Sequence, residues 1–169
     1  GIRINQLITD LLTATKAIEL NIRKVNINTI LDETLEMAAD RLDLSQVKVQ
    51  KQYANDICDV AVDEEKIKIA LLNIIVNAIE AMEKHKGILT LRTKNAGDQC
   101  IIEIEDNGGG MDEDTLQKLF EPYFTSKPKG NGLGLTNCQN IIMSHRGKIA
   151  VQSKVGKGSL FNVMLRIDD

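Results

Sequence analysis

Two glycine-rich segments constrain this chain more than any other feature. The first runs from Asp106 through Gly110, and the second, Gly130 to Gly134, follows about two dozen residues later. Glycine adopts positive φ angles and lets a backbone approach a ligand closely, so two such bends near each other indicate a phosphate-holding surface rather than packing. The chain is therefore predicted to bind a nucleotide.

The composition is that of a globular domain. The chain has 169 residues, of which 43% are hydrophobic, enough to bury the core of one domain with a small appendage. Its formal net charge is -3, and basic and acidic residues are mixed along the chain, so no electrostatic footprint for nucleic acid is present. Nucleic acid is therefore not expected among its partners.

The cysteines and the apolar runs predict the surroundings of the chain. Cys58, Cys100 and Cys138 are odd in number, far apart and set among apolar residues, which predicts buried thiols in a reducing compartment rather than a zinc site. No apolar run is long enough to span a bilayer, and the first residues lack a signal segment. We therefore predict a soluble, cytoplasmic chain, which is compatible with a membrane-anchored parent protein.

The first residues are patterned differently from the rest. Apolar side chains recur at three- and four-residue steps from the start, with no capping residue before them. They are Ile4, Leu7, Ile8, Leu11, Leu12 and Ile18. The pattern indicates the end of a longer coiled helix that pairs with another helix, and the alternative is an ordinary amphipathic helix lying on the domain. Residues 21–26 are expected to be a short connection, so we divide the chain into 1–24 and 25–169.

Helices in the rest of the chain come in a few blocks between paired strands. They are expected where apolar residues follow helical spacing, with Asn28 and Asp63 as N-caps, and strands are expected where apolar residues alternate or run on. The expected helices are 29–42, 63–84 and 133–145, and the expected strands are 47–51, 57–62, 87–94, 99–105, 148–153 and 159–167. This order predicts an α+β fold, with helices on one face of a sheet, rather than a doubly wound parallel sheet.

Two asparagines on the long second helix are candidate ligands. Asn73 and Asn77 are four residues apart, so they share one helical face amid many apolar residues. A buried amide without a partner costs on the order of 1 to 3 kcal/mol, so each amide needs a hydrogen bond. Backbone or water can supply it, or the amides can serve a magnesium ion and phosphate oxygens, for which an amide oxygen is a suitable hard ligand.

A carboxylate stands where the alternating strand turns into the first glycine segment. Asp106 can accept a hydrogen bond from the exocyclic amine of adenine, where guanine has a carbonyl, and it can equally cap its own turn. Downstream, Gly132 and Gly134 precede an apolar helix whose free N–H groups can hold phosphate. A Gly-x-Gly before a helix is weak on its own and gains weight here because it is not alone.

Five segments, in this order, resemble the nucleotide-binding boxes of sensor histidine kinases. They are Asn73-Ile74-Ile75-Val76-Asn77-Ala78, Asp106-Asn107-Gly108-Gly109-Gly110-Met111, Leu119-Phe120-Glu121-Pro122-Tyr123-Phe124, Gly130-Asn131-Gly132-Leu133-Gly134-Leu135 and Gly156-Lys157-Gly158-Ser159. The resemblance implies the Bergerat ATP-binding fold, a two-layer sandwich in which a mixed β-sheet is backed by three helices. It also implies that the N-terminal helix is left from a dimerisation and histidine-phosphotransfer hairpin.

The resemblance implies a role for each matched position. Asn77 would hold Mg2+, with Asn73 beside it on the phosphate side. Asp106 would receive the adenine amino group, with Ser159 assisting through water, and Lys127 would neutralise phosphate charge. The implied ATP-binding positions are Asn73, Asn77, Asp106, Gly108, Gly110, Met111, Phe124, Lys127, Gly130, Asn131, Gly132, Leu133, Gly134, Leu135 and Ser159.

The chain has only two histidines, and neither fits a phosphoacceptor. His85 is expected to be an exposed residue at a helix end, and His145 is expected to be structural. Ile69 stands where a polar residue is frequent in the family, so no catalytic residue is assigned. Glu80 and Ala81 replace the basic and aromatic residues that many members carry, which argues against adenine stacking there.

The resemblance implies a catalytic domain that binds ATP and Mg2+ and transfers the γ-phosphoryl group to a histidine of an upstream dimerisation domain. Relay to an aspartate in the receiver domain of a response regulator would follow, and the parent is expected to be a homodimer. Residues 112–131 between the glycine bends would form a mobile ATP lid. The chain alone is not expected to phosphorylate itself. A serine kinase of the anti-sigma-factor type and a non-catalytic nucleotide-binding adaptor are the alternatives.

Overall fold

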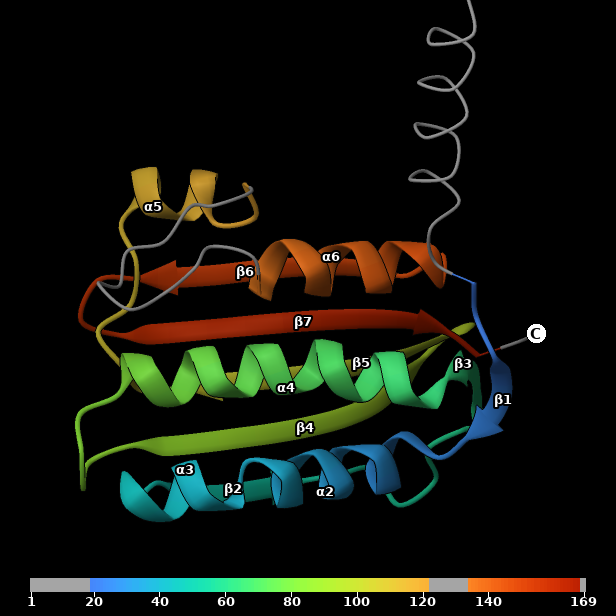
Figure 1. Cartoon of the computed structure of the whole chain (residues 1–169), viewed down its shortest axis with the longest axis horizontal. Helices are drawn as coiled ribbons and strands as arrows, with labels where there is room; N and C mark the ends of the chain where they lie inside the picture. The colour runs from blue at the N-terminus through green and yellow to red at the C-terminus, as the bar shows by residue number, and fades with distance from the viewer. Residues whose placement is uncertain (1–18, 122–133, 168–169) are drawn as a thin grey trace, which may run out of the picture.

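A mixed five-stranded sheet with helices packed on one face forms the body of the molecule (Figure 1). The computed structural model describes residues 19–121 and 134–167. Along the chain the elements are β1 (Ile22–Val25), α2 (Ile27–Met37), α3 (Ala39–Leu44), β2 (Lys48–Gln52), β3 (Val60–Asp63), α4 (Glu64–Ala81), β4 (Ile88–Ala96), β5 (Gln99–Asp106), α5 (Glu113–Lys118), α6 (Gly134–Ser144), β6 (Lys148–Lys154) and β7 (Gly158–Arg166). The predicted α+β fold is confirmed.

The strand order in the large sheet is β2-β4-β5-β7-β6. The edge strand β2 runs parallel to β4, and the remaining neighbours are antiparallel. Both predicted hairpins are present, because β4 pairs with β5 around Gly97, at φ 63°, and β6 pairs with β7. Alternating apolar residues and glycine-containing turns were sufficient to specify them.

The first helical block differs from its prediction at its start and in its middle. α2 begins at Ile27, and its N-cap is Asn26, whose Oδ1 accepts from Thr29 N, rather than Asn28. The side chain of Asn28 instead donates to the carbonyl of Ala54. The expected single helix 29–42 is broken at Ala38, where α2 ends and α3 begins, without a glycine or proline to announce the break.

The long helix α4 has the start that was predicted. Asp63 is its N-cap and accepts from Lys66 N at 3.1 Å. The helix ends at Ala81, three residues before the predicted end, because Met82 turns its backbone to an extended conformation. In the part of the chain that the structure describes, no helix is both long and apolar enough to cross a membrane.

A second, small sheet was missed. β1 pairs antiparallel with β3, from Ile22 opposite Asp63 to Val25 opposite Val60. Residues 21–26 were expected to be a plain connection, and that expectation is wrong. The strand residues Ile22, Arg23 and Lys24 are exposed, so the sequence carries no alternation between buried and polar positions. The pairing depends on a partner strand far along the chain.

The core lies between the large sheet and α2, α4 and α6 (Figure 1). Strand β5 alternates strictly, so Cys100, Ile102, Ile104 and Asp106 are buried while the residues between them are partly exposed. Successive side chains on a strand point to opposite faces, and Asp106 therefore continues the core-facing row at the end of the strand. The apolar pattern of β5 places a carboxylate at the edge of the core.

The cysteines follow their prediction in two of three cases. Cys100 and Cys138 are buried, and burial raises the pKa of each thiol to about 12. Cys58 is exposed, between β2 and β3, so the prediction of three buried thiols is wrong for this residue. Its apolar neighbour Ile57 is buried in the same connection, whereas Cys58 itself lies at the surface.

Candidate nucleotide-binding site

The site is built around Asp106, the last residue of β5. Its side chain is 4% exposed, and its Oδ1 accepts a hydrogen bond from Gly108 N at 2.8 Å. The aspartate therefore does cap its own turn, one of the two uses that the sequence left open. Ser159 on β7 lies directly opposite in the antiparallel register and is 7% exposed. Opposite residues share a face of the sheet, so the carboxylate and the hydroxyl are neighbours.

The first glycine bend is clamped between two backbones. A Cβ added at Gly108 would lie 2.4 Å from the carbonyl oxygen of Ala81, at the end of α4. At Gly110, which has φ 73°, it would lie 2.1 Å from the carbonyl oxygen of Lys154. Sequence reasoning interpreted these glycines as a surface for phosphate rather than for packing. In the structure both are required by close packing against the protein's own backbone.

Backbone and side-chain hydrogen bonds also hold the first glycine bend against α4 and the β6–β7 turn. Gly109 donates its N–H to the carbonyl of Ala81 at 3.2 Å, and its own carbonyl accepts from Gly156 N at 2.8 Å. Met111 N donates to Ser153 Oγ at 2.8 Å. The bend therefore joins the end of α4 to the turn between β6 and β7, which puts three segments far apart in sequence at one end of the molecule.

Asn107 is a site residue to which sequence reasoning gave no role of its own. Its Oδ1 accepts from Ile88 N at 2.8 Å, and its Nδ2 donates to the carbonyl of Lys86 at 3.0 Å. The side chain thereby fixes the bend to the start of β4. Its position between an aspartate and a glycine was a signal, because asparagine commonly hydrogen-bonds nearby backbone in turns.

Asn73 and Asn77 share one face of α4, and Asn73 contacts the start of α6. Both are half-buried, and Asn73 Nδ2 donates to the carbonyl of Gly134, the first residue of α6, at 3.0 Å. Asn77 lies one turn further along the same face and one turn before Ala81, whose carbonyl meets the glycine bend. The helix thus connects the two asparagines to the Asp106 region.

Several predicted site residues lie outside the residues that the structure describes. They are Phe124, Lys127, Gly130, Asn131, Gly132 and Leu133. Among the others, Gly134 begins α6, and Leu135 and Met111 are half-buried against the core. Within the predicted lid, residues 113–118 form the helix α5, which sequence reasoning had not assigned.

The start of α5 explains why that part of the chain is helical. Asp112 is its N-cap, and its Oδ1 accepts from Thr115 N at 2.8 Å. This hydrogen bond holds the pKa of Asp112 below its ordinary value. Past the helix, the hydroxyl of Thr136 on α6 donates to the carbonyl of Phe120 at 2.8 Å. The chain leaving α5 is therefore tied to the helix that begins beside Asn73.

Neither histidine lies in a helix that the structure describes. Nε2 of His145 accepts from Asp63 N at 3.0 Å, and its Nδ1 lies 2.8 Å from the carbonyl of Ile141. Backbone groups of two separate segments thus hold both ring nitrogens, and the predicted structural role is confirmed. His85 is exposed, as predicted, but lies in the connection after α4 rather than at the helix end.

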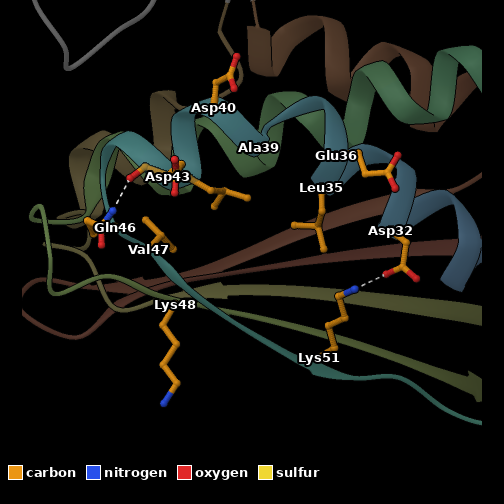
Figure 2. Close-up of a pocket in the computed structure, with 11 residues that line it drawn as sticks. Asp32, Leu35, Glu36, Ala39, Asp40, Asp43, Gln46, Val47, Lys48 and Lys51 are labelled. Atoms are coloured by element: carbon orange, nitrogen blue, oxygen red, sulfur yellow. Dashed lines mark hydrogen bonds and ion pairs between the residues drawn. The ribbon is translucent and has the colours of Figure 1, made fainter.

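A cavity of about 850 Å³ opens between α2, α3 and β2 (Figure 2). Four carboxylates from the two helices line it: Asp32, Glu36, Asp40 and Asp43. Lys51 reaches across from β2 to Asp32, with 2.8 Å between Nζ and Oδ1, so its charge is already paired. A triphosphate would meet excess negative charge here, and the cavity is not a candidate for the nucleotide.

Comparison with known proteins identifies the family of the chain. Residues 62–169 match the family of histidine kinase-, DNA gyrase B-, and HSP90-like ATPases. Sporulation kinase C of Bacillus subtilis (strain 168) is 33% identical over 164 residues, which are 96% of this chain and 38% of that protein. Sensor histidine kinase ZraS of Escherichia coli (strain K12) is 31% identical over 166 residues, 98% of this chain and 36% of that protein.

This chain therefore spans less than two fifths of the length of these curated relatives. Among solved structures, the catalytic domain of histidine kinase ThkA matches with a TM-score of 0.79 and 26% identity, covering 87% of this chain and 96% of that one. The match of fold includes the sheet and the helices behind it, which is the Bergerat-type arrangement that the sequence predicted. The chain belongs to the histidine kinase-, DNA gyrase B-, and HSP90-like ATPase family, as an ATPase domain of the sensor histidine kinase type.

Proposed function

We propose that this domain binds Mg-ATP and presents its γ-phosphoryl group to a histidine on an upstream domain of the parent protein. The observation that carries the proposal is the buried carboxylate of Asp106, which lies opposite Ser159 and beside a bend clamped to the end of α4. The same helix carries Asn73 and Asn77, so groups suited to the base and groups suited to the phosphates belong to one rigid frame.

Asp106 selects adenine. Its Oδ1 is oriented by the N–H of Gly108, so the carboxylate cannot rotate freely. A carboxylate only accepts hydrogen bonds, and adenine offers an exocyclic amine where guanine offers a carbonyl oxygen. A hydrogen bond to a charged group is worth roughly 1.5–3 kcal/mol, which gives adenine an advantage of about tenfold or more.

Asn77 is the proposed protein ligand of the magnesium ion. Among residues 19–121 and 134–167, no three His, Cys, Asp or Glu side chains gather to hold a metal, so most ligands must come from the nucleotide and water. An amide oxygen on a half-buried helical face suits such a partial site. When bound there, the ion would offset the negative charge of the phosphates. Lys127 and the N–H groups of the 130–134 segment are proposed to complete the neutralisation.

We assign the phosphoryl acceptor and the partner domains from the similarity of this chain to sensor histidine kinases. Each histidine of this chain is accounted for otherwise, since His145 is hydrogen-bonded through both ring nitrogens and His85 lies in an exposed connection. The proposed acceptor is a histidine of the parent's dimerisation domain, in a homodimer in the cytoplasm, with residues 1–24 belonging to that domain. A response-regulator receiver domain is the proposed next acceptor. The neighbours ShkA and ThkA have been solved with AMPPNP and with the response regulator TrrA, respectively.

Incubation of the 169-residue chain with radiolabelled ATP and Mg2+ tests the proposal. Calorimetric titration is expected to show nucleotide binding, and no acid-labile label is expected on the chain alone. Adding the parent's dimerisation domain should produce an acid-labile phosphohistidine on that domain. Acid-stable label on a partner's serine would indicate the serine kinase alternative, and nucleotide binding without label on any partner would indicate the non-catalytic adaptor.

A further inference from the structure

Ser153 on β6 belongs to none of the segments that predicted the site, yet its hydroxyl lies at the junction of two of them. Its Oγ accepts from Met111 N at 2.8 Å, at the end of the glycine bend. It also lies 3.1 Å from the carbonyl oxygen of Gly158 and 2.8 Å from Oγ of Ser159. One half-buried hydroxyl therefore contacts the bend, the start of β7 and the residue opposite Asp106.

The hydrogen-bonding capacity of a hydroxyl fixes the direction of each contact. Serine has one proton to donate and two lone pairs that accept. Met111 N–H can only donate and the carbonyl of Gly158 can only accept, so the proton of Ser153 goes to Gly158. The remaining lone pair of Ser153 then accepts the hydroxyl proton of Ser159. With its proton engaged, Ser159 can act only as an acceptor toward other partners.

We propose that Ser153 is a specificity-determining residue for the nucleotide base, because it holds the Ser159 hydroxyl as an acceptor beside the Asp106 carboxylate. The inference rests on the proposed binding of ATP. Asp106 and Ser159, which are 4% and 7% exposed, then present two neighbouring acceptors. Such a pair favours a ligand group that donates hydrogen bonds, either the adenine amine or a water molecule bound to it. They disfavour the carbonyl oxygen of guanine, which has no proton to give. Ser153 is thus a positioning residue that acts through Ser159.

Ser153→Ala tests this role. Without the acceptor at position 153, the Ser159 hydroxyl can rotate and donate to a guanine carbonyl. The affinity for ATP is expected to fall about fivefold and that for GTP to hold or rise, so their ratio should fall about five- to tenfold, the worth of one neutral hydrogen bond. Ser153→Thr keeps the hydroxyl and should keep the ratio. Ser144→Ala is a matched control, because its hydroxyl bonds the carbonyl of Asn140 at the far end of α6.

Competition titrations of the 169-residue chain with ATP and GTP, together with the amide shift of Met111 in the NMR spectrum, separate the outcomes. In a Ser159→Ala background, Ser153→Ala is expected to leave the ATP to GTP ratio unchanged while still shifting the Met111 amide. An equal loss of affinity for both nucleotides in Ser153→Ala would overturn the proposal and leave a purely structural serine. If the wild-type chain binds neither nucleotide, the proposed function fails as well.

Discussion

The two ends of α4 are closed in different ways. At the N-terminal end the closing partners are side chains: Asp63 accepts from Lys66 N and from Asn21 N at 2.9 Å, and the N–H of Asp63 donates to His145. At the C-terminal end the partners are backbone, because the carbonyl of Ala81 accepts from Gly109 and packs against Gly108. Helix ends must satisfy their orphan groups, and this helix uses two solutions.

The difference predicts what each end responds to. An end closed by side chains responds to a change of charge or pH. An end closed by backbone responds to an added Cβ wherever the neighbouring backbone leaves no room for it, however conservative the substitution. The proposed nucleotide site lies at the backbone-closed end, so glycine packing sets its geometry, while Asp106 and Ser159 add its polar chemistry.

Gly108→Ala, at the backbone-closed end, is expected to have the largest effect on stability and on ATP affinity. The added methyl group would lie 2.4 Å from a backbone oxygen that cannot move without shifting the end of α4. Overpacking of this kind costs roughly 1–3 kcal/mol, and we expect the upper end together with at least a tenfold loss of ATP affinity. Urea unfolding followed by circular dichroism, with calorimetric titration, measures both.

Gly109→Ala is the matched control for that substitution. The next glycine has no atom within 4 Å of an added Cβ, so its replacement should change the free energy of unfolding by less than about 0.5 kcal/mol. Equal destabilisation by the two substitutions would show that the bend needs flexibility rather than close packing at Gly108.

Asp106→Asn separates the chemistry of the site from its packing. The amide oxygen can still accept from Gly108 N, so the free energy of unfolding should change little, whereas the amide can donate where adenine also donates. Mg-ATP affinity is expected to fall about 10- to 100-fold, as measured by calorimetry. Asp98→Asn, at the β4–β5 turn, removes the same charge away from the site and should leave affinity unchanged. Unchanged affinity in Asp106→Asn would refute the assigned role.

The parts of the fold that were predictable have local signals. The cap of α4 at Asp63 and both hairpins follow from residue types within a few positions of each element. The β1 strand, Ile22–Val25, was not predictable, because its exposed residues gain their pairing only from β3. The break at Ala38 was missed for a similar reason, since alanine favours a continuous helix.

The residues assigned to the candidate site stood out in the sequence, but the contacts that support them did not. Asp106 stood out because an alternating strand ended in a carboxylate followed by glycines. The carbonyls of Ala81 and Lys154, which require those glycines, come from elsewhere in the sequence and left no local pattern. Ser153 was missed because a single serine in a strand is indistinguishable from any other until Met111 is placed against it.

Asn107→Ala and Asn95→Ala compare a support at the site with its counterpart at the other end of the sheet. Each side chain accepts from one backbone N–H and donates to one carbonyl: Ile88 and Lys86 for Asn107, Cys58 and Asp56 for Asn95. Each substitution is expected to lower the free energy of unfolding by about 1–2 kcal/mol. Only Asn107→Ala should also weaken ATP binding, by about threefold, because its bonds fix the bend. Equal effects on ATP affinity would show that the bend is held without Asn107.

Asp63→Asn addresses the side-chain-closed end and should have the smallest effect. Burial by itself raises the pKa of Asp63, but hydrogen bonds from Asn21 N and Lys66 N outweigh it and hold the pKa below its ordinary value. A carboxyl group with a depressed folded pKa contributes stability that is present above its unfolded pKa, about 3.9, and is lost as pH falls through the folded pKa. Asparagine caps a helix nearly as well without the charge.

Above about pH 5 the wild-type chain is therefore expected to be more stable than Asp63→Asn by about 1 kcal/mol, because asparagine lacks the anion at the helix N-terminus and its Nδ2 cannot accept from Asn21 N. The gap should close as pH falls below 3.9. Urea unfolding of both proteins at a series of pH values measures it. ATP affinity at neutral pH should be equal in the two proteins, since the site lies at the other end of α4. A stability gap independent of pH would assign the effect of Asp63 to shape rather than charge, and a loss of affinity would show that the two ends of the helix are coupled.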